Sequence, residues 1–112
     1  MKDLTPSDYE TIGRYVVGQS HLYMNAIEKH SELVHLSNEN ESEIHKEEAK
    51  SDKDMQKLSK LYTEYRQLKA DLFANRSFRQ NLCDKMLTRV NEVVHPESYQ
   101  NGTTIEDLKN EE

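Results

Sequence analysis

The sequence contains few of the residues that end helices or form covalent cross-links. Its 112 residues include three glycines, two prolines, one cysteine and no tryptophan. With so few turn-forming residues, the composition favours a chain that is rich in helix and elongated. Because Cys83 has no second cysteine to pair with, an internal disulfide and a thiolate pair for a metal are both excluded.

Apolar residues are also scarce, and they never form a long run. Hydrophobic residues make up 34% of the chain, which excludes a large core, and charged residues make up 32%. The longest apolar runs are only two or three residues, as at 15–17, whereas a membrane span needs roughly 18–20. No apolar secretion signal follows Met1. We therefore expect a cytoplasmic protein without a transmembrane segment.

The charges are arranged in blocks along the chain. Residues 53–91 carry nine Lys or Arg and four acids, a net charge of +5, whereas the whole chain has −6. The segments 28–52 and 92–112 each have a net charge of −5. Such blocks are typical of long helices that pair with surfaces of opposite charge.

A first helix is predicted from about residue 6 to residue 36. Thr5 and Asp8 have the spacing of a capping box, and Pro6 suits a first helical position. At about 100° per residue, the large apolar side chains fall on one narrow stripe. They are Tyr9, Ile12, Val16, Tyr23, Ile27 and Val34, with the polar Gln19 and His30 on the same stripe.

The chain reversal is expected in the linker of about residues 37–50, because residues 37–42 are polar and prefer caps and turns. Two alternatives remain open. One continuous helix through residues 37–50 would break no steric rule, and Ser51 to Asp54 has the form of a second capping box.

The second helix is predicted from about residue 51 to residue 95, where Pro96 ends it. Its apolar residues Leu58, Leu61, Tyr65, Leu68 and Leu72 are spaced alternately three and four apart, as in a coiled coil. The predicted fold class is therefore all-α, a long antiparallel helical hairpin or coiled-coil-like bundle within residues 1–95. Two such helices bury little alone, so we expect self-association to complete the bundle.

Residues 96–112 are predicted to be an acidic, flexible C-terminal tail. The alternative is one or two helical turns against a basic, apolar groove, because Ile105 and Leu108 are three apart and follow a Thr-x-x-Glu cap at residues 103–106.

No catalytic, cofactor or metal site is predicted. Glu41, His45 and Glu48 share one helix face, but a solvated charged face near a turn has the same spacing. Cys83 has no neighbouring base in the sequence that would activate it, so we read it as a small helix residue and not as a nucleophile.

The basic block has two readings. Its charges flank the apolar stripe, which is typical of bundle residues that pair with the acidic faces of residues 28–52. Interleaved tyrosines and phenylalanines are also what a protein that binds single-stranded DNA or RNA uses for stacking. The candidate nucleic-acid contacts are Arg66, Lys69, Arg76 and Arg79.

In size, acidic balance and long Tyr- and His-bearing helices, the chain resembles small helical accessory proteins of bacteriophages. The runs at residues 9–36 and 54–94 resemble the helical recombination mediators of T-even-like phages. The resemblance implies a role in loading a recombinase on single-stranded DNA, and no residue role is carried over from it.

The leading hypothesis is a non-enzymatic interaction module, acting as an adaptor, assembly factor or inhibitor, with protein partners and a homo-oligomeric state. The residues predicted as its interface or core are Tyr9, Ile12, Val16, Tyr23, Ile27, Leu58, Leu61, Tyr65, Leu68 and Leu72. The competing hypothesis is an accessory factor of nucleic-acid metabolism, whose oligomer presents the basic block of residues 53–91.

Overall fold

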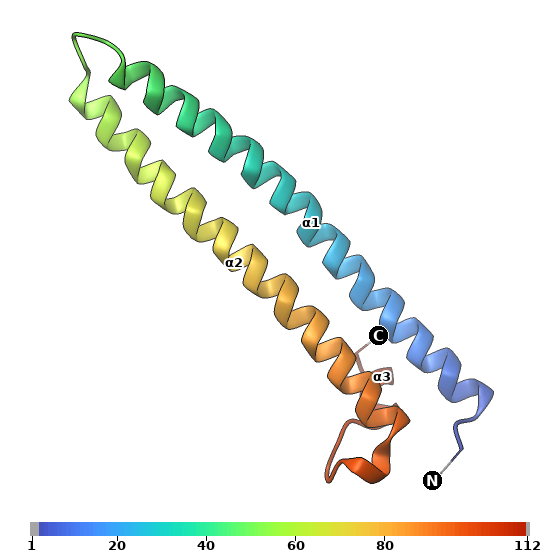
Figure 1. The fold of residues 1–112 in the computed structure, drawn as a ribbon. Helices are drawn as coiled ribbons and strands as arrows, with labels where there is room; N and C mark the ends of the chain where they lie inside the picture. The colour runs from blue at the N-terminus through green and yellow to red at the C-terminus, as the bar shows by residue number, and fades with distance from the viewer. Residues whose placement is uncertain (1–2, 112) are drawn as a thin grey trace. The chain divides into compact units, whose positions relative to one another are not determined.

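The computed structural model describes residues 3–111, and its regular elements are helices (Figure 1). Helix α1 spans Pro6–Glu48, α2 spans Met55–Val94, the short 3-10 helix η1 spans Pro96–Ser98, and α3 spans Ile105–Lys109. The chain is 83% helical, and no strand occurs among the described residues. The prediction of an all-α helical hairpin is confirmed. Within the described range, no helix has an apolar stretch long enough to cross a lipid bilayer.

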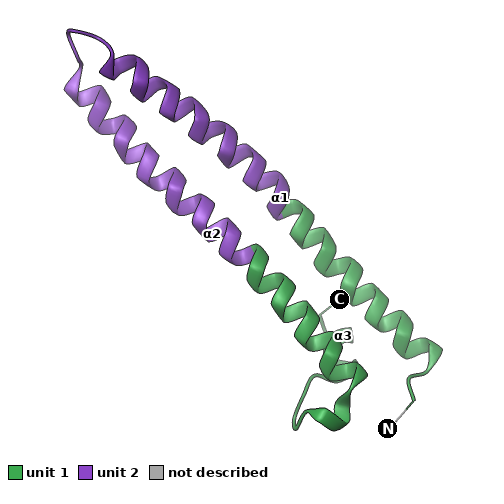
Figure 2. Cartoon of the chain, in the orientation of Figure 1, with its two compact units in different colours: residues 1–25, 79–112 green, residues 26–78 purple. Residues whose placement is uncertain are grey.

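The chain divides into two compact units, and each contains a segment of both long helices (Figure 2). Unit 2 is residues 26–78 and includes the turn between α1 and α2. Unit 1 combines residues 1–25 with residues 79–112, so it also contains η1 and α3. Each unit has buried side chains of its own.

In unit 2, α1 and α2 pack through a seam of residues spaced alternately three and four apart. This spacing returns to the same side of a helix every two turns, so it forms one continuous contact line. Every seam residue is fully or partly buried. The seam consists of Ala26, His30, Leu33, Ser37, Asn40, Ile44 and Glu47 on α1, and Leu58, Leu61, Tyr65, Leu68, Leu72 and Asn75 on α2.

Helix α1 continues to Glu48, well past the end predicted near residue 36, so the turn is not within residues 37–48. The polar run was misread because two of its members occupy seam positions. Ser37 and Asn40 are buried, and the Asn40 amide donates a hydrogen bond of 3.0 Å to the carbonyl of Leu61. Packing across the seam therefore overrides the weak helix preference of these residues, as tertiary context commonly does.

The turn occupies residues 49–54 and is organised around Glu47, whose side chain is only 2% exposed. Its carboxylate accepts a hydrogen bond of 2.9 Å from the backbone N–H of Asp54 and pairs with Lys50 at 2.7 Å. Lys57 lies 3.9 Å from the same carboxylate. The bond from Lys50 and the Asp54 N–H together hold the pKa of Glu47 below its usual range.

Asp54 begins α2, because its carboxylate accepts a hydrogen bond of 3.1 Å from the backbone N–H of Lys57. The predicted break near Ser51 to Asp54 is therefore in the right place. The capping residue is Asp54 itself, and not Ser51.

The core of unit 1 joins α1, α2 and α3. Tyr15, Val93 and Leu108 form its buried centre. Partly buried apolar side chains pack around this centre; they are Ile12, Val16, Met86, Val90 and Ile105. Burial raises the pKa of the Tyr15 hydroxyl, and the nearby Arg89 guanidinium opposes this rise.

The segment predicted to be a tail is folded, because it supplies part of that core. Leu108 is fully buried, at 0% exposed, so the sequence alternative of a short helix is the one observed. The cap lies one residue later than predicted: Thr104 and Asp107 form the capping box, not Thr103 and Glu106. The turn before it places Asn101 in the left-handed region, at φ 61°.

Glu92 of α2 holds the loop segment that leads into α3 through hydrogen bonds. Its carboxylate accepts hydrogen bonds from the Thr103 hydroxyl at 2.6 Å and from the Thr103 backbone N–H at 2.8 Å. These bonds, the hydroxyl first, hold the pKa of Glu92 below its usual range. Arg89, one turn earlier on α2, forms an ion pair with Glu111.

Candidate interaction surfaces

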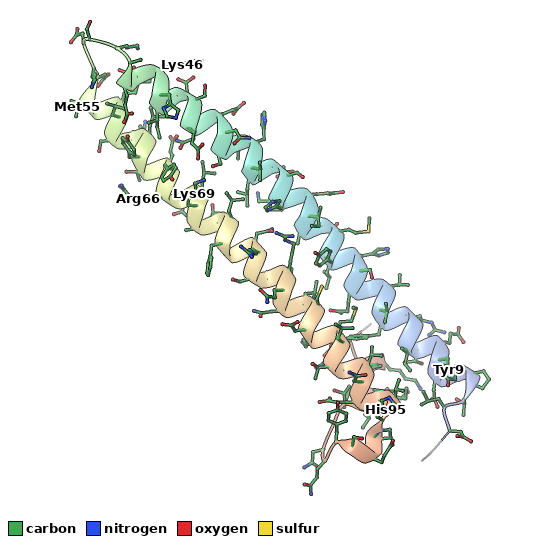
Figure 3. All side chains as sticks on the ribbon, viewed as in Figure 1. Tyr9, Lys46, Met55, Arg66, Lys69 and His95 are labelled. Atoms are coloured by element: carbon green, nitrogen blue, oxygen red, sulfur yellow. The ribbon has the colours of Figure 1, made fainter. Side chains whose placement is uncertain are left out.

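The residues predicted as core or interface differ widely in exposure. Leu58 is buried in the unit 2 seam. Tyr9 and Ile27 are exposed on α1, and Figure 3 labels Tyr9 near the start of that helix. The remaining seven are partly buried: Ile12, Val16, Tyr23, Leu61, Tyr65, Leu68 and Leu72.

Ile27 and Val34 are exposed because each follows a seam residue, Ala26 or Leu33, by one position. They belong to a second stripe on α1, which turns away from the seam yet has the same spacing of three and four. Val17 and Met24 of this stripe are 55% and 61% exposed. The second stripe of α1 consists of Gly13, Val17, Ser20, Met24, Ile27, Ser31 and Val34, and the same spacing leads on to Asn38, Glu41, His45 and Glu48.

Helix α2 has a second stripe of its own. Phe73 is its most exposed aromatic residue, at 73%, and Met55, Tyr62 and Leu87 are also exposed. Basic residues alternate with them on the same line. The second stripe of α2 consists of Met55, Ser59, Tyr62, Arg66, Lys69, Phe73 and Arg76 in unit 2, followed by Gln80, Cys83 and Leu87 in unit 1.

In unit 2 the two second stripes lie on the same side of the hairpin. Lys69 forms an ion pair with Glu41 at 3.1 Å, and the Tyr62 hydroxyl donates a hydrogen bond to Glu48. Each pair joins a stripe residue of α2 to a stripe residue of α1, which requires a shared face. We call this the docking face of unit 2: Ile27, Val34, Glu41 and Glu48 from α1, with Tyr62, Arg66, Lys69, Phe73 and Arg76 from α2.

The charge on the docking face is divided between the helices. The acidic residues, Glu41 and Glu48, come from α1, and all three basic residues come from α2. Figure 3 labels two of them, Arg66 and Lys69, on α2. Lys69 also lies 5.2 Å from the centre of the Tyr65 ring. The hydrogen bond to Glu48 raises the pKa of Tyr62.

The four candidate nucleic-acid residues are not all on one surface. Arg66, Lys69 and Arg76 belong to the docking face of unit 2, whereas Arg79 belongs to unit 1, where it is partly buried. The ion pairs of Lys57 with Glu47 and of Lys69 with Glu41 agree with the predicted pairing between the basic block and residues 28–52.

Glu41, His45 and Glu48 do not form a free ligand set. Lys69 occupies the Glu41 carboxylate, and Tyr62 donates to Glu48. Both carboxylates therefore have partners within the hairpin.

Unit 1 has an apolar groove between its two helix segments. The cavity measures about 230 Å³. Three of its residues, Ser20, Met24 and Cys83, also belong to the second stripes. The groove is lined by Gln19, Ser20, Tyr23, Met24, Leu82, Cys83 and Met86. A cavity of this size suits one large apolar side chain of a partner.

Sequence reasoning missed the second stripes because it assigned Ile27 and Val34 to the seam. The signal was present in the sequence: the spacing of three and four from Gly13 to Val34 and from Met55 to Leu87 marks a second line on each helix. In comparisons with protein-family models, with curated proteins and with solved structures, nothing matches the chain.

Proposed function

We propose that the protein is a non-enzymatic helical interaction module that acts as an adaptor, assembly factor or inhibitor by docking on other proteins. The observation that carries this proposal is the second stripe on each long helix, which holds apolar side chains in water after the seam has formed. A cytoplasmic location belongs to the same proposal, as does the role of a phage accessory protein that the resemblance of residues 9–36 and 54–94 implies.

The exposed stripe residues are a reason for binding because their burial is favourable. A large apolar side chain that passes from water into an interface contributes about 1.5–3 kcal/mol when it becomes fully buried. In unit 1, Met24 and Leu87 are exposed stripe residues, and Met24 lines the apolar groove. A few such anchors around a pocket commonly supply most of the affinity of a protein interface.

The test is affinity capture from the native cell, followed by a mass measurement of the intact complex. We expect Met24→Asp and Leu87→Asp to remove the captured protein, because each places a charge in the interface. Leu22→Asp is the matched control, since Leu22 is an exposed leucine of α1 outside the second stripe. Capture that is equally strong with all three variants would contradict the proposal.

A second candidate function is supported by one feature of α2. Arg66, Lys69 and Arg76 alternate with Tyr62 and Phe73 on a single helix face. Proteins that bind single-stranded DNA or RNA without sequence preference use cationic side chains to contact the phosphates and aromatic side chains on which the bases stack. An accessory role in nucleic-acid metabolism is therefore the alternative proposal.

Salt dependence tests this alternative. A binder should retard a single-stranded oligonucleotide at low salt, and its affinity should fall steeply as the salt concentration rises. Replacing Arg66, Lys69 and Arg76 with Gln should abolish binding, whereas replacing Lys60 and Lys85, which lie outside the docking face, should preserve most of it. An oligonucleotide that is not retarded at low salt removes the alternative.

A further inference from the structure

We propose that the docking face of unit 2 binds a second copy of this chain, with α1 of each copy lying on α2 of the other. This inference rests on the proposed interaction function and names one partner for it. The pairing would convert two hairpin segments into a four-helix bundle.

The seam alone buries few apolar side chains in unit 2. Its buried apolar side chains are Ala26, Leu33, Ile44 and Leu58, while Ser37, Asn40 and Glu47 occupy other buried positions. At the same time Ile27, Val34, Tyr62 and Phe73 remain exposed on one face. A second copy presents the same apolar residues, so face-to-face pairing covers both sets together.

The charges decide how two copies meet. With a two-fold axis parallel to the helices, the acidic stripe of α1 in each copy lies on the basic stripe of α2 in the other copy. A two-fold axis across the helices lays α2 on α2, and Arg66, Lys69 and Arg76 then face basic residues. Because like charges across an interface disfavour association, the first arrangement is selected.

The register follows from pairs already formed within one hairpin. Glu41 reaches Lys69 and Glu48 reaches Tyr62, so residues of the two stripes stand in level rows one heptad apart. A two-fold axis parallel to the helices keeps these rows level. Glu41 then lies level with Lys69 of the second copy, and Val34 lies level with Arg76 of the second copy.

The first experiment measures mass by light scattering. The full chain should have twice the 13.2 kDa of a single chain. The acidic variant Arg66→Glu/Arg76→Glu and the basic variant Glu41→Lys/Glu48→Lys should each fall to the single mass and keep their helical circular dichroism. Mixing the two should restore the double mass, because each altered stripe again faces a stripe of opposite net charge. A monomeric full chain, or a mixture that stays monomeric, would overturn the proposal.

The second experiment tests orientation with single cysteines in a Cys83→Ser background. Val34→Cys mixed with Arg76→Cys should form a disulfide between the two chains under mild oxidation. Val34→Cys alone should not, and neither should Glu64→Cys, which is exposed outside the docking face. Cross-linking of Val34→Cys to itself would mean that α1 lies on α1 and would refute the arrangement.

The result also separates this inference from the proposed function. A full chain that stays monomeric, but whose captured partner is lost with Met24→Asp, would refute self-docking and leave the interaction function standing. A monomer that retards an oligonucleotide through Arg66 and Arg76 would likewise refute self-docking and assign the face to nucleic acid.

Discussion

At the residue scale, three polar side chains hold segments of the chain together. Glu47 fastens the turn, Asn40 bridges the seam, and Glu92 anchors the chain before α3. Each bonds to backbone groups or to residues distant in sequence. Hydrophobic spacing cannot identify such residues, because it counts apolar side chains and treats these three as solvated.

Leu108 is the residue whose truncation should cost most in unit 1. It is fully buried against Tyr15 and Val93, so Leu108→Ala should lower the free energy of unfolding by about 2–5 kcal/mol. Urea denaturation followed by circular dichroism measures this loss. The control is Leu87→Ala, an exposed leucine whose truncation should change the free energy by less than about 0.5 kcal/mol. Equal midpoints for both variants would mean that α3 does not pack as described.

Glu92 should make the stability of unit 1 depend on pH. Its folded pKa lies below its unfolded pKa because Thr103 bonds to the carboxylate, so the ionised form stabilises the fold. This contribution is complete above the unfolded pKa and is lost as the pH falls through the folded pKa. The melting temperature should therefore fall on acidification, and Glu92→Gln should flatten that dependence. Glu64→Gln, at an exposed site, should leave the wild-type curve unchanged, and a Glu92→Gln curve as steep as the wild type would refute the role.

At the element scale, the sequence predicted α2 better than α1 for a physical reason. Leu58 to Leu72 fill their seam positions with large apolar residues, so the repeat is visible in the sequence. The seam of α1 contains Ala26, Ser37 and Asn40 instead, and it is recognised only when the opposite helix is present. Because small and polar residues occupy these seam positions, the turn was predicted too early and the second stripes were not recognised. For the same reason Ile27 was assigned to the seam.

The short helix α3 has clear local sequence signals, but its stability depends on contacts that are distant in sequence. The sequence predicted its two apolar residues and a capping box one residue too early, yet a segment of five helical residues cannot be stable by itself. Packing of Leu108 on residues of α1 and α2 supplies the stability, and that contact is distant in sequence.

Asn40 provides a test of what a buried amide does in the seam. Its amide donates to the Leu61 carbonyl, while its Oδ1 is buried without a hydrogen bond. Asn40→Leu removes that unsatisfied oxygen, so it should raise the free energy of unfolding by about 1 kcal/mol. A buried polar residue in a coiled-coil seam commonly specifies register and oligomeric state, so we expect the variant to show a mixture of masses by light scattering. Asn25→Leu, at an exposed position of the same helix, should change neither quantity. A lower denaturation midpoint for Asn40→Leu would show that the hydrogen bond outweighs the apolar gain.

At the scale of the whole molecule, each unit has a small core and exposes apolar side chains on its helices. The buried apolar residues of the described chain number seven, against thirteen exposed large ones. A folded state with so little burial depends strongly on what covers its surface, because the binding of any partner to the native state alone adds to its stability.

Self-docking therefore predicts a melting temperature that rises with protein concentration. Mass action favours the paired native state, so a tenfold increase in concentration should raise the midpoint by a few degrees. Phe73→Ser should remove this dependence, because Phe73 is the most exposed aromatic residue of the docking face. Phe78→Ser is the matched control: Phe78 is also in unit 2 and is 49% exposed, but it lies outside both second stripes. Circular dichroism melts across the concentration range measure both variants. A wild-type melting temperature that is independent of protein concentration would contradict the assignment of this face. Loss of the concentration dependence in Phe78→Ser would also contradict it.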